Sequence, residues 1–302
     1  MQGAAGASNA PAAVCWWPRV ALSLVALAAA ATRFFLVSTL PTPFEHCHGD
    51  SPILIGTHHK TGTVLLKHIF LKEVCPLLKW KCSFDNHPVP CTSPEQARSA
   101  GLHVCFLQHG VRFKVQGSTE PYRFIHAIRD PLEVVLSGYQ YHLKTTEKWA
   151  NRVQERYNGT TYRRYLNALS LDDGLRAEVK HSMRDSLKTM PRLLNRTRAN
   201  SCTLTLRLED FELDWNSAVA RIWDLLGMDA ATTRRLNHAV AKHNVYTAKR
   251  KYNRHVSNAS SRSVMRQRIK RLPDAYAKVV MVRGRLGYPD VGKEGARSTT
   301  GS

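Results

Sequence analysis

Acidic residues are scarce in this chain of 302 residues, where 23 Asp and Glu stand against 44 Lys and Arg and give a formal net charge of +21. The excess is concentrated near the C-terminus, because 17 Lys and Arg but only 3 Asp and Glu fall within residues 231–302. A field of this sign attracts phosphates, sulfates, acidic membranes and other polyanions, and it indicates no particular fold. The hydrophobic content of 43% excludes a wholly disordered chain, and 17 glycines without a triplet period exclude collagen.

Several motifs that carry known chemistry are also missing. The chain has no Cys-x-x-Cys, no His-Glu-x-x-His and no Gly-x-Ser-x-Gly, which argues against zinc ribbons, thioredoxin-like sites, zinc proteases and serine hydrolases. No helix-turn-helix, zinc finger or RNA-stacking motif is present, so we expect no nucleic-acid partner. We likewise predict no metal, and we interpret His58-His59 and His46-Cys47-His48 as local, solvated histidines.

The N-terminal residues 1–44 contain no Asp or Glu. Within them, Val20–Thr32 is an uninterrupted run of 13 apolar or small residues. Taken as one helix, Val20–Leu40 would be about 31 Å long, which is enough to span a bilayer. We therefore predict a tail, a signal-anchor and a stem in residues 1–44, with the N-terminus cytoplasmic. A cleaved signal peptide, an organelle transit peptide and a buried core helix are the alternatives.

Six of the seven cysteines follow the apolar run, and four of them lie between Cys75 and Cys105. If the chain enters the secretory route, this spacing favours one to three disulfides, with at least one inside that cluster. Buried thiols in a cytosolic fold are the alternative. Sequons at Asn158, Asn195 and Asn258 permit N-glycosylation.

Apolar runs alternate with helical periodicity from residue 51 onward. Strands are predicted at 51–57, 102–108, 123–128 and 203–207; helices are predicted at 61–74, from Pro131, through most of 161–195 and at 215–226. Residues 75–100 are loop-rich, and residues 231–290 are basic and helical in part. The alternation predicts a single α/β domain over residues 45–290, with a central parallel sheet flanked by helices, and a disordered tail over 291–302. In such a sheet, ligands bind at the carboxyl ends of the strands.

The first candidate site is the loop Thr57–Thr63, which connects a predicted strand to a helix. The N-terminus of a helix binds phosphate through its unpaired N–H groups and its dipole. Lys60 adds a positive charge, Thr61 and Thr63 add hydroxyls, and Gly62 permits a close approach of the backbone. The loop is not a Walker A motif, because Lys60 precedes the glycine instead of following it. A plain polar turn is the alternative.

The second candidate site also follows an apolar strand and opens a helix. Arg129 ends the strand before Asp130-Pro131, and Ser137 lies about two turns into the helix. Arginine offers a bidentate fork to phosphate, and serine adds a hydroxyl donor. A surface arginine beside a capping Asp130 is the alternative.

Together, the two loops resemble the nucleotide-binding signatures of sulfotransferases that use 3'-phosphoadenosine-5'-phosphosulfate. Lys60-Thr61-Gly62-Thr63 is similar to that family's 5'-phosphosulfate loop, and Arg129-Asp130-Pro131 with Ser137 is similar to its 3'-phosphate motif. A third stretch, Leu206–Phe211 with the later Leu225–Met228, resembles a segment of Golgi-type members. The sequence departs from the pattern at Val64-Leu65, where aromatic or hydroxyl residues are frequent, and at Leu208, which replaces a tyrosine.

The resemblance implies a P-loop-like phosphate-binding loop and assigns roles to single residues. Lys60 would stabilise the leaving phosphate, and Thr61, Gly62 and Thr63 would hold the 5'-phosphosulfate. Arg129 and Ser137 would hold the 3'-phosphate. By analogy with cytosolic relatives, His109 would be the general base that deprotonates the acceptor, whereas Golgi relatives often use a glutamate.

We therefore expect a Golgi sulfotransferase, anchored in the membrane by its N-terminus, that transfers a sulfuryl group to a hydroxyl or amine of an acceptor, foremost a carbohydrate. A secreted or organelle-targeted form is the alternative for localisation. A phosphotransferase similar to nucleotide kinases and a non-enzymatic basic protein that binds polyanions are the alternatives for function.

Overall fold

The computed structural model describes residues 44–47, 49–244 and 259–289, which belong to one unit that begins at Phe44. The predicted membrane anchor, the predicted tail 291–302 and the Asn258 sequon lie outside the described residues. Within the described residues, no helix is both long and apolar enough to cross a membrane. The predicted boundaries near residues 44 and 290 stay predictions.

A five-stranded parallel sheet in the order β2-β3-β1-β4-β7 forms the centre of the fold. Its strands are β1 (Ile53–Gly56), β2 (Cys82–Phe84), β3 (Val104–Leu107), β4 (Arg123–Ile128) and β7 (Thr203–Arg207). The three inner strands are buried throughout, as the uninterrupted apolar runs require. The predicted fold class, a single α/β domain with a central parallel sheet flanked by helices, is confirmed. The short edge strand β2 was not predicted.

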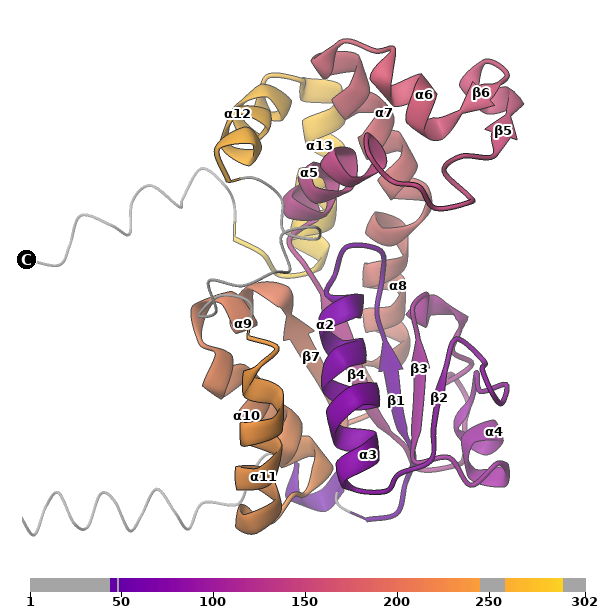
Figure 1. Ribbon diagram of the computed structural model, residues 1–302, viewed down its shortest axis with the longest axis vertical. Coiled ribbons are helices and arrows are strands. Elements are labelled where there is room, and N and C mark those ends of the chain that lie inside the picture. The colour runs from indigo at the N-terminus through magenta and orange to yellow at the C-terminus, as the bar shows by residue number, and fades with distance from the viewer. Residues whose placement is uncertain (1–43, 48, 245–258, 290–302) are drawn as a thin grey trace, which may run out of the picture. The chain divides into compact units, whose positions relative to one another are not determined.

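Helices cover both faces of this sheet (Figure 1). Side chains alternate along β1: Ile53 and Ile55 pack with Phe70 of the first helix on one face, and Leu54 packs with Leu193 on the other. The helices are α2 (Thr63–Lys67), α3 (Cys75–Leu77), α4 (Pro94–Ser99), α5 (Pro131–His142), α6 (Tyr162–Asn167), α7 (Leu171–Arg184), α8 (Ser186–Thr197), α9 (Leu208–Leu213), α10 (Trp215–Leu226), α11 (Ala230–Ala241), α12 (Ala259–Lys270) and α13 (Pro273–Arg285). Helices α5, α7, α8, α12 and α13 build a second apolar cluster beyond the end of β4.

Short one-turn elements and a small hairpin complete the described residues. The one-turn elements are η1 (Glu45–Cys47), η3 (Gly110–Arg112) and η4 (Glu155–Tyr157), and the hairpin joins β5 (Val153–Gln154) to β6 (Thr160–Thr161). Between α2 and α3 the wider turn η2 (His68–Val74) keeps the helix continuous. The helix predicted over 61–74 therefore continues to Leu77.

Two predicted helix boundaries are confirmed by their caps. The carboxylate of Asp130 accepts a hydrogen bond from the Leu132 N–H, 2.8 Å away, and starts α5 with Pro131 in its first turn. Gly227 ends α10 in the left-handed conformation, with φ of 68°. These caps fix where the chain leaves β4 and where α10 ends before α11.

Three disulfides join Cys47 to Cys202, Cys75 to Cys82 and Cys91 to Cys105. The prediction of at least one disulfide between Cys75 and Cys105 is confirmed, because two bonds lie there. His46 lies beside the Cys47–Cys202 pair, but cysteines that are bonded to each other have no thiolate to offer a metal ion. His46 is exposed, as predicted.

Candidate active site

The loops that follow β1 and β3 are joined at the carboxyl edge of the sheet. The Thr57 N–H donates to the Leu107 carbonyl at 3.1 Å, and the Gly110 N–H donates to the Thr57 carbonyl at 2.9 Å. A Cβ on Gly110 would lie 2.6 Å from the Cα of Gly56, so this close approach requires glycine. The sheet thereby brings His109 next to the loop that carries Lys60.

The loop Thr57–Thr63 is held by its own hydroxyls. Thr61 Oγ1 donates to the His58 carbonyl at 3.0 Å and accepts from the His58 N–H at 2.9 Å. Thr63 Oγ1 lies 2.8 Å from Thr57 Oγ1 and 3.2 Å from the same His58 carbonyl. Gly62, with φ of 96°, is the N-cap of α2 and offers no side chain to the cap. Because the first N–H groups of a helix have no partners within it, this end of α2 can accept an anion.

Lys60 lies between aromatic and cationic groups. Its Nζ lies 4.2 Å from the centre of the Tyr141 ring. Burial and the nearby Arg129 lower the pKa of Lys60 to about 8, although Glu147 and Glu178 act in the opposite direction. The ammonium is thus poorly compensated, and an anionic ligand beside it would be strongly favoured.

Arg129 connects the second loop to the first. Its Nη1 donates to the Lys60 carbonyl at 3.2 Å, and its Nη2 lies 4.0 Å from the Glu133 carboxylate. Glu133 also pairs with Arg262, at 3.2 Å, and with Arg266 of α12. Three arginines therefore surround one carboxylate, which leaves an excess of positive charge around Glu133, and Arg129 extends from this group to Lys60.

Ser137 lies one helical turn beyond Glu133 on α5, on the same face of the helix. The residue is buried, with 2% of its surface exposed. No contact joins Ser137 to Arg129 within the described parts of the chain, so only their shared helix face relates them. The phosphate roles of these two residues stay predictions.

His109 follows β3 and pairs with an acidic residue from another element. Its Nδ1 lies 3.4 Å from the Asp185 carboxylate, at the junction of α7 and α8. Asp185 raises the pKa of His109, although burial and Arg112 act in the opposite direction. His103 lies at the start of the same strand, where its ring stacks on Trp80 at 5.7 Å.

The expectation that His58 and His59 are local and solvated is wrong for both side chains: His59 contacts His142, 83 positions away, and His58 is the more deeply buried of the two. The His58 side chain is buried, its Nε2 lies 2.9 Å from Nε2 of His126 on β4, and its Nδ1 lies 2.9 Å from the Thr189 hydroxyl on α8. Burial lowers the pKa of His58 to about 3 and also lowers the pKa of His126, so both rings are neutral. A histidine within the apolar run of β4 is the one sequence signal that pointed to such a pair.

His59 belongs to a second polar chain, which the sequence did not reveal. Its Nε2 lies 3.1 Å from Nε2 of His142, whose Nδ1 lies 2.8 Å from the buried Glu178 carboxylate. Tyr162 donates to the same carboxylate at 2.8 Å. Burial would raise the pKa of Glu178, but its hydrogen bonds with His142 and Tyr162 outweigh burial and hold the pKa below its ordinary value. This series of hydrogen bonds links the loop Thr57–Thr63 to the buried carboxylate of α7.

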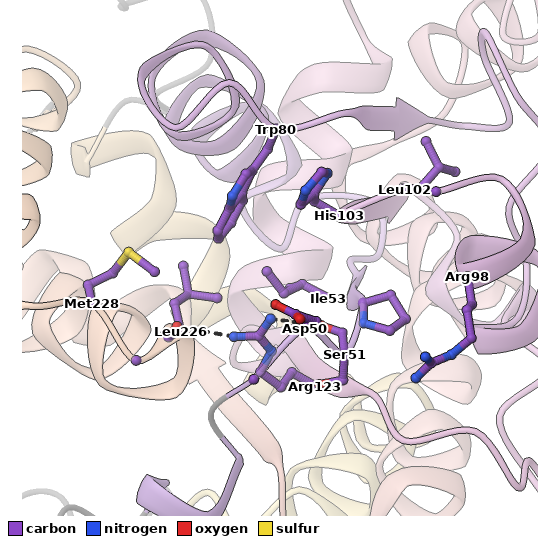
Figure 2. A pocket seen from close by; sticks show the side chains of 14 residues that line it. Asp50, Ser51, Ile53, Trp80, Arg98, Leu102, His103, Arg123, Leu226 and Met228 are labelled. Carbon is purple, nitrogen blue, oxygen red and sulfur yellow. Dashed lines mark hydrogen bonds between the residues drawn. The ribbon is translucent and has the colours of Figure 1, made fainter.

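A cavity of about 620 Å³ lies at the opposite, amino edge of the sheet. Figure 2 shows Trp80 and His103 along one wall and Arg123 across from them. The Arg123 guanidinium donates to the carbonyls of Leu226, at 3.1 Å, and Ser51, at 2.7 Å, so it holds chain segments together. None of the predicted site residues lines this cavity.

The described residues therefore define a parallel α/β protein with two cationic loops at the carboxyl edge of its sheet. No protein-family model matches the sequence, and no curated protein matches it. Among solved structures, the chain is similar to the mouse sulfotransferase SULT7A1 complexed with PAP, at 12% identity and a TM-score of 0.44, over 81% of this chain and 88% of that chain. A likeness this distant assigns no role to any residue here.

Proposed function

We propose that the protein is a sulfotransferase that moves the sulfuryl group of 3'-phosphoadenosine-5'-phosphosulfate to an acceptor hydroxyl or amine. The observation that carries the proposal is the hydrogen bond from Arg129 to the Lys60 carbonyl, at 3.2 Å. It joins two cationic loops, one at a helix start and one among three arginines. A donor with phosphate groups at both its 5' and 3' positions matches two such loops, whereas ATP, with one phosphate chain, matches one.

The proposed chemistry assigns one step to each of these residues. The acceptor oxygen forms a bond to sulfur while the bond between sulfur and the 5'-phosphate oxygen breaks, which yields a sulfate ester and 3',5'-ADP. The negative charge that develops on the leaving phosphate is stabilised by Lys60 and by the N–H groups at the start of α2. His109 Nε2 takes the proton of the acceptor, since its Nδ1 faces Asp185. No metal takes part in this proposal.

The proposed acceptor is a carbohydrate. The Trp149 side chain lies beside the loop Thr57–Thr63. Its ring centre is 6.4 Å from that of His59, and the ring stacks on His181 with 5.4 Å between the centres. Trp149 is exposed, unlike most large aromatic residues of the described chain. The Trp149 N–H already donates to Glu147, so the indole offers a flat apolar surface, which suits the C–H face of a sugar ring.

The proposed location is the Golgi membrane, with the α/β domain in the lumen and residues 1–44 as anchor and stem. Three disulfides in one domain are typical of an oxidising compartment and support this proposal. Asn158 and Asn195 are both exposed, as glycosylation in the lumen would require. Secretion after cleavage of the N-terminal segment is the alternative that N-terminal sequencing of the mature protein tests.

Thermal unfolding of the purified chain with 3',5'-ADP, ATP or GTP tests the donor. A ligand at 100 times its Kd stabilises the folded state by about 2.7 kcal/mol, which a melting curve resolves. We expect 3',5'-ADP to raise the melting temperature and ATP and GTP to have little effect. Stabilisation by ATP alone would instead support a phosphotransferase, and equal stabilisation by any polyanion would support a non-enzymatic basic protein.

A further inference from the structure

We propose that Asp185 is a positioning residue for His109, whose carboxylate holds Nδ1 of the imidazole and leaves Nε2 directed to the acceptor. This inference rests on the proposed sulfuryl transfer and adds a residue to it. Asp185 lies 76 positions after His109 in the sequence and comes from the junction of α7 and α8, whereas His109 follows β3. The pair therefore exists only in the folded chain, and neither loop motif contains Asp185.

The carboxylate of Asp185 does not cap the helix that it precedes. Asp185 occupies the N-cap position of α8, where aspartate normally accepts from the first helical N–H groups. Its side chain makes no such capping hydrogen bond. Within the described residues, the one ion pair or hydrogen bond of this carboxylate is with His109 Nδ1, at 3.4 Å. The side chain therefore interacts with the imidazole of His109 instead of capping α8.

Hydrogen bonds connect the backbone around Asp185 to the loop Thr57–Thr63. Thr189 Oγ1 donates to the Asp185 carbonyl at 2.6 Å, so it accepts from His58 Nδ1 at 2.9 Å. The neighbouring Ser186 hydroxyl donates to the His59 carbonyl at 3.1 Å. These bonds tie the start of α8 to the loop that carries Lys60. The carboxylate is therefore set at a defined place relative to the proposed leaving group.

The charged groups around His109 leave Asp185 as its main anionic partner. Asp85 also faces the imidazole, but its carboxylate already accepts from the Gln108 N–H, at 2.9 Å, and from Arg112, at 3.1 Å. Arg112 and burial favour the neutral ring, and His58 is itself neutral. Asp185 also lies near His59 and His181, and His109 holds the pKa of Asp185 down against the effect of burial.

The sign of the effect follows from these neighbours. Asp185 raises the pKa of His109, so its loss lowers that pKa, since burial and Arg112 remain. A base with a lower pKa is deprotonated at lower pH, which moves the acid limb of the kcat/KM profile to lower pH. The same substitution also frees the ring to rotate, which lowers kcat.

The test compares the full-length wild type with Asp185→Asn and Asp185→Glu. Asp173→Asn is the matched control, because Asp173 is an exposed aspartate at the start of α7 that pairs with Arg176. An NMR titration, with the His109 signal assigned by its loss in His109→Gln, gives the pKa directly. We expect Asp185→Asn to lower the His109 pKa, shift the acid limb equally and reduce kcat about 10- to 100-fold. Asp185→Glu should restore part of each, and Asp173→Asn should change none.

An unchanged His109 pKa in Asp185→Asn would overturn the inference, as would a fall in kcat without any shift of the acid limb. If the wild type is active, either result leaves the proposed function intact and refutes only the positioning role of Asp185. If the wild type transfers no sulfuryl group, the proposed function fails, and the inference fails with it. The titration distinguishes these cases because it needs no turnover.

Discussion

Replacement of Arg129 by alanine tests recognition of the donor's 3'-phosphate separately from recognition of its 5'-phosphate. Arg129 is the group assigned to the 3'-phosphate, and 13% of its side chain is exposed. A hydrogen bond to a charged group in such a place is worth about 1.5–3 kcal/mol. Since 1.4 kcal/mol is a factor of ten, Arg129→Ala should weaken binding of 3',5'-ADP roughly 10- to 100-fold. Binding of 5'-AMP, which lacks the 3'-phosphate, should change by only a few-fold.

Isothermal titration calorimetry with both nucleotides measures this difference. Arg268→Ala is a matched control, because Arg268 is an exposed arginine of α12 that pairs with Asp172 on another helix. Arg129→Lys keeps the charge but loses the fork, so it should lie between wild type and alanine. Equal weakening of 3',5'-ADP and 5'-AMP would show that Arg129 acts only by holding the Lys60 carbonyl, and the assignment to the 3'-phosphate would be refuted.

Three further predictions concern the base, the lysine and the cysteines. His109→Ala should abolish transfer with nearly unchanged affinity for 3',5'-ADP, whereas His103→Ala should leave turnover within a few-fold of wild type. Normal turnover of His109→Ala would show that another residue is the base, and Glu147, near Lys60, is the next candidate. Because the Lys60 pKa is lowered to about 8, the charged form that the donor needs is lost above that pH, so kcat/KM should fall as pH rises through about 8. Lys60→Arg should move this limb to much higher pH, and an unmoved limb would assign it to another group. Thiol labelling of denatured, non-reduced protein should leave Cys75, Cys82, Cys91 and Cys105 unlabelled, and labelling of all four would contradict the disulfides.

The sequence was sufficient where local patterns decide the structure. Strands β4 and β7 and helix α10 occupy the predicted residues, because each combines an apolar run or period with a clear boundary, such as Asp130 or Gly227. Strand β2 was missed because its three residues lie in a loop-rich stretch and are too few to show alternation. The wide turn η2 between α2 and α3 was also not predicted.

The polar contacts behind the loops could not be predicted, because they join residues far apart in the chain. His58 meets His126 across 68 positions and Thr189 across 131. A single sequence shows each of these residues without its partner, so His58 looked like an ordinary solvated side chain. Asp185 was overlooked for the same reason, because it lies 76 positions after His109 and inside a stretch that was predicted to be mainly helical.

The central claim is that Lys60 and its loop stabilise a leaving phosphate in sulfuryl transfer. The most direct test is to incubate the full chain with radiolabelled 3'-phosphoadenosine-5'-phosphosulfate and a mixture of glycans, and to measure labelled product for wild type and Lys60→Ala. The account predicts labelled glycan with the wild type and a loss of about 100- to 1,000-fold in kcat for Lys60→Ala, with 3',5'-ADP still bound. Near-normal turnover of a folded Lys60→Ala variant, or a wild type that binds 3',5'-ADP no better than ATP and labels nothing, would contradict it.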